Sequence, residues 1–354
     1  MGININDLLT IAVQKKASDC HIKPGLPPRF RIHGELTNIV SNVITHEIAL
    51  TFLDQVLTKD RKEQFQKNCD IDGLHVVPNV GRFRYNFFRQ KGLFHMVFRH
   101  IPNLIPTVDG LGLPKILKEF AMAERGIILV TGTTGSGKST SLAAMINHIN
   151  ENDSLNIITI EDPVEFFHTD KKCLISQRTL GEDVPSFSHA LKYVLRQDPD
   201  VILVGEMRDQ ETISTAITAA ETGHLVFSTL HTTDAQQTVE RIIDTYPSTL
   251  HHQIRKQIAL NLQGVVSQRL LPKKDGTGRV AALEILVATP TVRKIIAEGE
   301  VTKLYKVISE GELEGMQTFN QALLKFLQQD LITEEEAFRA ATRPEELKLA
   351  LQTT

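Results

Sequence analysis

A glycine-rich segment at residues 132–139 reads Gly-Thr-Thr-Gly-Ser-Gly-Lys-Ser and matches the pattern G-x-x-x-x-G-K-[ST] in full. It follows an apolar run at 127–131 and precedes helix-forming residues at 141–150, which is the strand–loop–helix context that the pattern requires. Glycines allow backbone N–H groups to close around phosphate oxygens at the positive end of the following helix. A chance glycine-rich turn would not carry the full pattern in this context, so the segment predicts a site for nucleotide phosphates.

The residue types in this loop also predict individual roles. The Lys138 side chain is expected to reach the β- and γ-phosphates of ATP, and the Ser139 hydroxyl is expected to ligate Mg²⁺. The expected nucleotide contacts are Gly132, Thr133, Thr134, Gly135, Ser136, Gly137, Lys138, Ser139 and Thr140.

The middle of the chain predicts a parallel α/β sheet. Four continuous apolar runs, at 127–131, 157–160, 201–204 and 225–229, are typical of strands buried on both faces. Helix-like stretches separate these runs, as the crossovers between parallel strands require. In such sheets the ligand site lies at the carboxyl ends of the strands. Acidic residues that follow the apolar runs are therefore expected near Lys138.

Changes of pattern divide the chain into four parts. Residues 1–100 mix short helices and strands and predict a small α+β domain. Residues 101–114 are rich in proline and glycine and predict a linker that acts as a hinge. Residues 115–290 hold the predicted sheet, and residues 291–354 have a mostly helical pattern with polar faces.

Local patterns in the first part predict specific elements. Apolar residues spaced for one helix face predict a helix over 3–16, and Thr45 is expected to cap a helix over 46–57. Residues 81–90 alternate between aromatic and polar side chains, which predicts a strand, and residues 93–100 are expected to return as its hairpin partner.

Two carboxylates that follow predicted strands are candidates for chemistry. Glu165 lies shortly after the run at 157–160 and is predicted to orient or deprotonate an attacking water. Glu206 follows the run at 201–204 and is predicted to hold Mg²⁺ or its waters. An aspartate usually follows this strand directly, but here that position is Gly205.

An alternative for the first acidic group is a structural ion pair. Glu161, Asp162 or Glu165 would then pair with Arg178 or Lys171, because carboxylates in ion pairs and in active sites have similar neighbours.

Histidines and arginines supply further candidates. His231 ends the buried run at 225–229 towards the phosphate region and is predicted to sense the γ-phosphate, and His224, which begins the same run, is also assigned a functional role. Arg84 and Arg99 lie on the predicted hairpin of the first part. They form either a solvated basic strand face or an arginine clamp that closes on the nucleotide, as transition-state arginines do in other NTPases.

Composition excludes several classes of protein. The formal net charge of the 354-residue chain is −3, which argues against a nucleic-acid binder that relies on bulk positive charge. Three widely spaced cysteines favour neither a disulfide framework nor a zinc site and suit a reduced cytoplasmic setting. No signal peptide and no membrane-length apolar run is recognised, so any membrane contact is expected to be peripheral.

Four motifs together resemble those of the type II/IV secretion ATPases. Besides the phosphate loop, residues 161–165 (EDPVE) are similar to the aspartate box of that family, residues 195–209 (LRQDPDVILVGEMRD) to its signature, and residues 223–234 to its histidine box. Shorter matches extend the similarity to the type IV pilus retraction ATPases of the PilT and PilU type over nearly the full length. They lie at residues 17–19, 25–28, 81–84 and 315–318.

This resemblance implies a RecA-like P-loop motor domain, a PAS-like N-terminal domain and a homohexameric ring that retracts pili by hydrolysing ATP. It implies Glu165 as the catalytic glutamate, Glu206 as the Walker B acid, and Arg84 and Arg99 as arginines that clamp the nucleotide. It also implies a cytoplasmic ring held at the inner membrane by a pilus platform protein, with a paralogous retraction ATPase as a further partner. No direct contact with nucleic acid is implied.

One departure from the family pattern leaves the subtype open. Residues 291–298 (TVRKIIAE) stand where retraction ATPases carry an AIRNLIRE-like motif, and only Arg293, Ile295 and Glu298 match it. The extra N-terminal domain and tetracysteine motif of assembly ATPases are not recognised here. The alternatives are a principal retraction motor, an accessory ring with little ATPase activity of its own, and a motor for a secretion or DNA-uptake fibre.

A nucleic-acid translocase with the same core is a rival from another class. It would line its channel with basic and aromatic residues, whereas this chain has no tryptophan and only four tyrosines. Stimulation of ATP hydrolysis by single-stranded DNA would distinguish it from a pilus motor.

Overall fold

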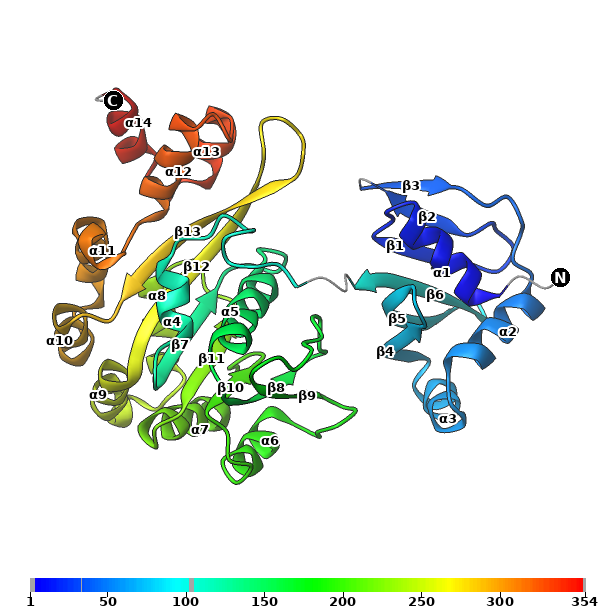
Figure 1. Ribbon diagram of the computed structural model, residues 1–354, viewed down its shortest axis with the longest axis horizontal. Coiled ribbons are helices and arrows are strands. Elements are labelled where there is room, and N and C mark those ends of the chain that lie inside the picture. Colours follow the sequence, from blue (N-terminus) through cyan, green and yellow to red (C-terminus); the bar gives the residue numbers. More distant parts are fainter. Residues whose placement is uncertain (1–3, 33, 102–104, 353–354) are drawn as a thin grey trace. The chain divides into compact units, whose positions relative to one another are not determined.

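A computed structural model describes residues 4–32, 34–101 and 105–352, and the chain divides into two compact units (Figure 1). The first unit is Met1–Leu104 and the second is Ile105–Thr354. No helix in the described ranges is both long enough and apolar enough to cross a bilayer.

The first unit is an antiparallel sheet with helices packed against one face. Its strands lie in the order β3-β2-β1-β6-β5-β4. They are β1 (Asp19–Ile22), β2 (Arg29–Ile32), β3 (Glu35–Asn38), β4 (Asp70–Val77), β5 (Gly81–Gln90) and β6 (Leu93–Ile101). The helices are α1 (Ile5–Gln14), α2 (His46–Val56) and α3 (Lys59–Asn68).

The local patterns of this unit are confirmed. The apolar face of α1 is buried, and the Thr45 hydroxyl accepts a hydrogen bond from the Ile48 N–H at the start of α2. Burial alternates along β5, with Phe83 and Phe87 in the core and Arg84 half-buried on the other face. This alternation gives the sheet an apolar face under the helices and an arginine-bearing open face.

The second unit is built on a mixed, mostly parallel sheet of seven strands in the order β13-β12-β7-β11-β10-β8-β9. All neighbouring strands pair in parallel except β12 and β13. The strands are β7 (Gly126–Thr131), β8 (Asn156–Glu161), β9 (Leu174–Thr179), β10 (Val201–Val204), β11 (Leu225–Leu230), β12 (Leu262–Pro272) and β13 (Arg279–Val287). The predicted parallel α/β sheet is therefore confirmed, and the long β12–β13 hairpin is an addition that the sequence patterns did not reveal.

Helices cover both faces of this sheet. Along β7, Ile127 and Leu129 belong to one apolar cluster, and Ile128 and Val130 belong to another on the opposite face. This explains why the central strands are continuous apolar runs. The cluster of Ile128 includes α4 (Ile116–Ala121) and α5 (Lys138–Asn152). The cluster of Ile127 includes α6 (Phe187–Val194), α7 (Gln210–Glu221), α8 (Ala235–Asp244), α9 (His251–Asn261), α10 (Pro290–Glu298) and α11 (Leu304–Glu310).

The C-terminal region is helical, as predicted. Helices α12 (Phe319–Gln328), α13 (Glu334–Ala340) and α14 (Pro344–Gln352) form a separate apolar cluster with Leu271 of β12 and Ala282 of β13. The guanidinium of Arg269 stacks on the Phe319 ring at 3.8 Å and also donates a hydrogen bond to the Ala340 carbonyl. The last helices therefore pack on the edge hairpin of the sheet. The short 3₁₀ segments are η1 (Ser248–Leu250), η2 (Val301–Lys303) and η3 (Glu312–Glu314).

The predicted linker at 101–114 is only partly a connecting segment. Ile101 ends β6, residues 102–104 lie outside the described residues, and Val108 and Leu113 are buried in the cluster that also holds α4. The second half of the predicted linker therefore packs as part of the second unit.

A buried carboxyl group lies where β13 meets α8. Glu284 is 2% exposed, and its side chain accepts the N–H of Ala235 at 2.9 Å. Burial raises the pKa of Glu284 to about 7; the Ala235 N–H opposes this shift, the charge of Asp234 adds to it, and the charge of Arg269 opposes it. The folded chain therefore holds this proton at pH values where the unfolded chain has released it.

Replacing Glu284 with glutamine should flatten the dependence of stability on pH. An ordinary glutamate has a pKa of 4.5, and Glu284 has a pKa of about 7. This difference stabilises the folded state by on the order of 3 kcal/mol below pH 4.5, and the stabilisation is lost as pH rises to 7. Melting curves from pH 4.5 to 7.5 measure this. The exposed Glu314→Gln serves as the control, and an unchanged pH slope in Glu284→Gln would contradict the raised pKa.

Candidate active site

The predicted phosphate loop connects β7 to α5, and three glycines with left-handed backbone angles give it its shape. Their φ values are +142° at Gly132, +79° at Gly135 and +91° at Gly137. A Cβ atom on Gly132 would lie 2.5 Å from the carbonyl oxygen of Gln268, and one on Gly137 would lie 2.7 Å from the amide nitrogen of the same residue. The backbone angle disfavours other residues at both positions, and at Gly132 the backbone of β12 also leaves no space for a side chain.

Some hydrogen-bond donors in this loop have no partner among the described residues. Helix α5 begins at Lys138, and Gly137 at its N-cap position offers no side chain to its first N–H groups. The Ser136 hydroxyl is buried and makes no hydrogen bond to the described residues. Free helix N–H groups and a buried hydroxyl are donors that a phosphate group would satisfy.

The Lys138 ammonium lies inside the loop. It donates hydrogen bonds to the carbonyl oxygens of Gly132 at 2.8 Å and Thr133 at 3.1 Å. Burial lowers the pKa of Lys138, and the negative charges of Glu206 and Glu165 oppose that shift. Both candidate acids therefore lie close enough to interact with the lysine charge.

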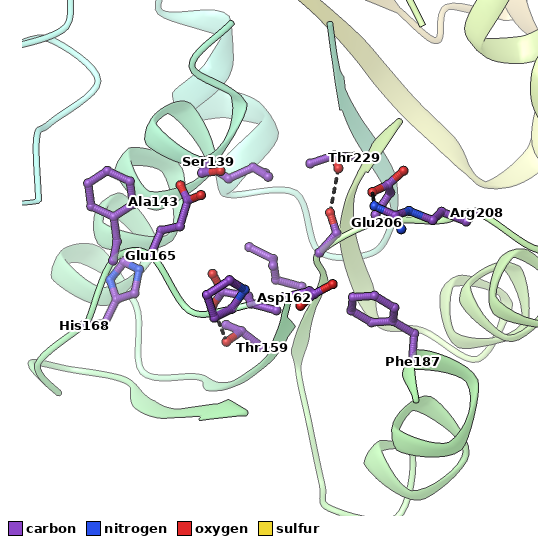
Figure 2. A pocket seen from close by; sticks show the side chains of 16 residues that line it. Ser139, Ala143, Thr159, Asp162, Glu165, His168, Phe187, Glu206, Arg208 and Thr229 are labelled. Carbon is purple, nitrogen blue, oxygen red and sulfur yellow. Dashed lines mark hydrogen bonds and ion pairs between the residues drawn. The ribbon is translucent and has the colours of Figure 1, made fainter. Parts of the chain in front are cut away.

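A cavity of about 110 Å³ brings three predicted site residues together (Figure 2). Ser139 comes from the first turn of α5, Glu165 from the loop after β8, and Glu206 from the loop after β10. In Figure 2, Glu165 lies on the same side of the cavity as Ser139, and Glu206 lies on the other side with Arg208. The three residues meet because each follows a strand or loop at the same edge of the parallel sheet.

Close packing at Gly205 explains why the acid after β10 is displaced by one residue. A Cβ atom there would lie 3.2 Å from the Ile160 carbonyl oxygen and 3.3 Å from Cα of Glu161. The Thr229 hydroxyl also donates to the Gly205 carbonyl at 2.6 Å and fixes this peptide. A side chain at position 205 would press on β8, so the carboxylate is carried by Glu206 instead.

Two basic side chains face the Glu206 carboxylate. Arg208 approaches it at 2.7 Å and His231 at 3.5 Å. Burial alone would raise the pKa of Glu206, but the hydrogen bond from Arg208 and the charges of His231, Arg208 and Lys138 lower it below its ordinary value. The group is therefore kept ionised, as a metal-binding or charge-stabilising carboxylate must be.

The structure separates the two candidate histidines. They flank β11, which has six residues, so they lie roughly 20 Å apart at opposite ends of the strand. His224 lies at the amino end, where its ring contacts the Ala219 carbonyl at 2.8 Å and the Thr222 hydroxyl at 3.1 Å. It lies at the end of α7, outside the cavity that holds Glu206, and the functional role expected for His224 stays a prediction.

The alternative of a structural ion pair for the first acidic group is not seen in the structure. Lys171 pairs with Glu151 at 2.6 Å instead. Arg178 donates to the Asp183 carbonyl at 3.4 Å. Glu161 accepts hydrogen bonds from neutral side chains, as described below, so the described contacts leave the Glu165 carboxylate available to the cavity.

The clamp candidates lie on the open face of the sheet in the first unit. Arg84 and Arg99 are directly opposite each other on β5 and β6. Arg99 pairs with Asp19 at 2.8 Å, and Arg31 lies 3.9 Å from the same carboxylate, which is 5% exposed. Two guanidinium groups therefore face one carboxylate, and the Arg84 side chain lies next to Arg99 on the neighbouring strand. Like charges directly opposite on neighbouring strands are destabilising, so this row favours binding of an anion.

Three contributors to the site were not predicted. Gln268 accepts a hydrogen bond from the Ser141 hydroxyl at 2.8 Å while packing on the phosphate loop, and it lies on a strand that no local pattern revealed. Thr229 was hidden within an apolar run. Arg208 was visible two residues after Glu206, but its contact depends on a turn whose geometry the sequence does not specify.

Comparisons with known proteins agree with this geometry. The family described as Type II/IV secretion system protein matches residues 2–339. The chain is 43% identical over 343 residues to the type IV pilus retraction ATPase PilT of Pseudomonas aeruginosa, covering 97% of this chain and 99% of that protein. It is 46% identical over 320 residues to a twitching motility protein of Neisseria gonorrhoeae, covering 90% of this chain and 86% of the relative.

A solved structure is similar over both units. The crystal structure of the pilus retraction motor PilT with bound ADP has a TM-score of 0.93 and 42% sequence identity, covering 98% of this chain and 99% of that one. The expected fold class is therefore confirmed.

Replacing Lys138 with alanine should abolish nucleotide hydrolysis, because among the described residues no other ammonium lies within the phosphate loop. Phosphate release by the purified variant measures this, and the exposed Lys172→Ala should retain activity. Turnover of Lys138→Ala equal to that of the unmodified protein would show that the site has been assigned wrongly.

Proposed function

The chain belongs to the type II/IV secretion system protein family, and we propose that it is the ATP-hydrolysing motor that retracts a type IV pilus. The observation that carries this proposal is the meeting of Ser139, Glu165 and Glu206 in one cavity beside Lys138. That the motor retracts the pilus is inferred from two relatives, named as a pilus retraction ATPase at 43% identity and as a twitching motility protein at 46% identity.

In this proposal the phosphate loop holds the β- and γ-phosphates of ATP. The Lys138 ammonium exchanges its two carbonyl partners for phosphate oxygens. The first N–H groups of α5 donate hydrogen bonds to the same phosphates. The affinity of the site then comes mainly from this one loop. Glu165 takes the proton of the attacking water or holds that water in line with the γ-phosphate.

Ser139 and Glu206 fit a magnesium ion. Both offer hard oxygen ligands in one cavity, and Mg²⁺ is bound typically through one or two protein oxygens together with phosphates and waters. When bound, the ion neutralises charge that develops on the phosphates. Arg208 and His231 both contact Glu206. A change in the charge around this carboxylate would therefore alter the interaction of both side chains with it.

The arginine row of the first unit is proposed to bind the same nucleotide. Arginine suits phosphate oxygens because its planar group donates two parallel hydrogen bonds. Asp19 holds Arg99 at the sheet face before any nucleotide arrives. ATP would then draw the two units together about the part of the predicted linker that joins them, and loss of the γ-phosphate would release them.

The wider assembly is proposed by similarity to the relatives. The motor works as a homohexameric ring held at the cytoplasmic side of the inner membrane by a pilus platform protein, and a paralogous retraction ATPase is a further partner. An accessory ring remains an alternative for the subtype, and it predicts nucleotide binding with negligible turnover by the purified protein alone.

Replacing Glu165 and replacing Glu206 should impair hydrolysis in different ways. Glu165→Gln keeps the size of the side chain but loses the base, so ATP should bind while turnover falls by roughly a hundredfold or more. Glu206→Gln should mainly raise the Mg²⁺ concentration needed for half-maximal hydrolysis. Turnover measured across a magnesium titration separates them, and Glu124→Gln, an exposed glutamate before β7, is the control. Normal turnover of the first variant with an unchanged magnesium response of the second would remove both roles.

The arginine clamp predicts a loss of hydrolysis and a loss of movement. Arg84→Ala or Arg99→Ala should leave ATP affinity nearly unchanged, because the phosphate loop dominates it, and should lower turnover by roughly tenfold or more. The control is Arg29→Ala, which changes the same face of the sheet outside the arginine row and should not lower turnover.

Movement is measured by energy transfer between dyes on Cys69, which is exposed, and on Leu313→Cys, at a fully exposed position of the second unit. Labelled subunits are diluted in unlabelled ones so that only pairs within one chain report. ATP should change the transfer in the parent protein and not in the two clamp variants. Unchanged turnover and an unchanged response in those variants would rule out the clamp.

A further inference from the structure

The side chain of Gln177 makes three hydrogen bonds to one loop beside the cavity. Gln177 lies on β9, the edge strand next to β8. Its amide nitrogen donates to the Phe166 carbonyl at 2.8 Å and to the Glu161 carboxylate at 3.2 Å. Its amide oxygen accepts the backbone N–H of His168 at 2.8 Å. One amide therefore contacts both ends of the segment that carries Glu165.

Other contacts also hold this loop. The backbone N–H of Glu165 donates a hydrogen bond to the Glu161 carboxylate, which also accepts from the Gln177 amide. The Asn150 side chain holds the Thr169 carbonyl at 2.8 Å, at the far end of the loop. Val164 is 3% exposed and supplies an apolar contact next to Glu165. An apolar contact is not directional, so the three hydrogen bonds of Gln177 contribute to the direction that the loop takes.

A second hydrogen bond completes the support behind the loop. The Thr159 hydroxyl donates to the Glu161 carboxylate at 2.7 Å, and Thr159 lies directly opposite Gln177 in the β8–β9 register. Burial raises the pKa of Glu161, while the hydrogen bonds from Thr159 and Gln177 oppose that shift and the charge of Glu165 adds to it. Burial also lowers the pKa of His168 to about 4, so its ring is neutral near pH 7. The loop thus brings no positive side chain of its own to Glu165.

We propose that Gln177 is a positioning residue for hydrolysis, which fixes the 161–168 loop and thereby holds the Glu165 carboxylate in the cavity. Gln177 does not line the cavity itself. It acts only through the loop, and the inference rests on the proposed role of Glu165. The phosphate loop lies on β7 and α5 and has no described contact with Gln177, so nucleotide affinity does not depend on it.

The test replaces Gln177 with leucine, which keeps the volume and removes all three hydrogen bonds. The control is Ser176→Ala, at the adjacent exposed position of the same strand. Turnover of Gln177→Leu should fall at least tenfold, while the dissociation constant for a non-hydrolysable ATP analogue should change less than threefold. Hydrogen exchange should rise in the amides of residues 162–169 and stay unchanged in the phosphate loop. The control should match the parent protein in all three measurements.

A second variant covers the case in which leucine weakens folding. Gln177→Glu keeps the acceptor for the His168 N–H but loses both donors and puts a carboxylate beside Glu161. Its turnover should fall and should fall further as pH rises, because loss of the second proton from two neighbouring carboxylates leaves two charges that repel each other. Turnover within twofold of the parent protein in either variant, or a parallel loss of turnover and nucleotide affinity, would overturn the proposal.

Measuring Glu165→Gln alongside separates this inference from the proposed function. If Glu165→Gln is inactive while Gln177→Leu is normal, Gln177 has no positioning role and the catalytic assignment stands. If Glu165→Gln hydrolyses ATP normally, the catalytic assignment fails, and the exchange of residues 162–169 alone reports whether Gln177 holds the loop.

Discussion

The parallel register of β7, β11, β10 and β8 is the constraint on which the candidate active site depends. Backbone hydrogen bonds align the four strands so that all their carboxyl ends lie at one edge. Lys138, Glu165, Glu206 and His231 each follow one of these strands, which is why residues distant in sequence reach one cavity or its border. Apolar clusters on both faces keep the register from shifting, since a slip of one residue would exchange the two buried faces.

Sequence patterns predicted the parts of the structure that are encoded over short distances. The phosphate loop, the apolar strands and the capped helix after Thr45 each depend on fewer than about fifteen neighbouring residues. Gln268 escaped prediction because its role arises from contact with glycines more than a hundred positions away. The order of residues along β11 already distinguished its two histidines, since the run begins after His224 and ends before His231. The contacts that each ring makes could not be predicted, because they depend on neighbouring elements.

Several hydrogen-bond donors and positive charges in the protein are placed so that a bound anion would stabilise them. Among the described residues, no side chain caps the first N–H groups of α5 and the buried Ser136 hydroxyl has no hydrogen-bond partner, and Arg84 lies opposite Arg99 on neighbouring strands. The strands that carry these groups are anchored by buried side chains in the cores of the two units. Such preorganisation means that ligand binding does not have to order the groups first, which leaves more of the interaction energy for affinity or for movement.

The apolar clusters of the two units share no residue, and this has a consequence for biosynthesis. The cluster of the first unit is complete at Phe98, and the clusters of the second begin at Val108. A ribosome adds roughly 5–20 residues per second, and domains with their own core generally fold as units. The first unit can therefore fold while the motor half is still being translated. The β12–β13 hairpin, which completes the second sheet, follows late in synthesis, and the last helices follow at its end.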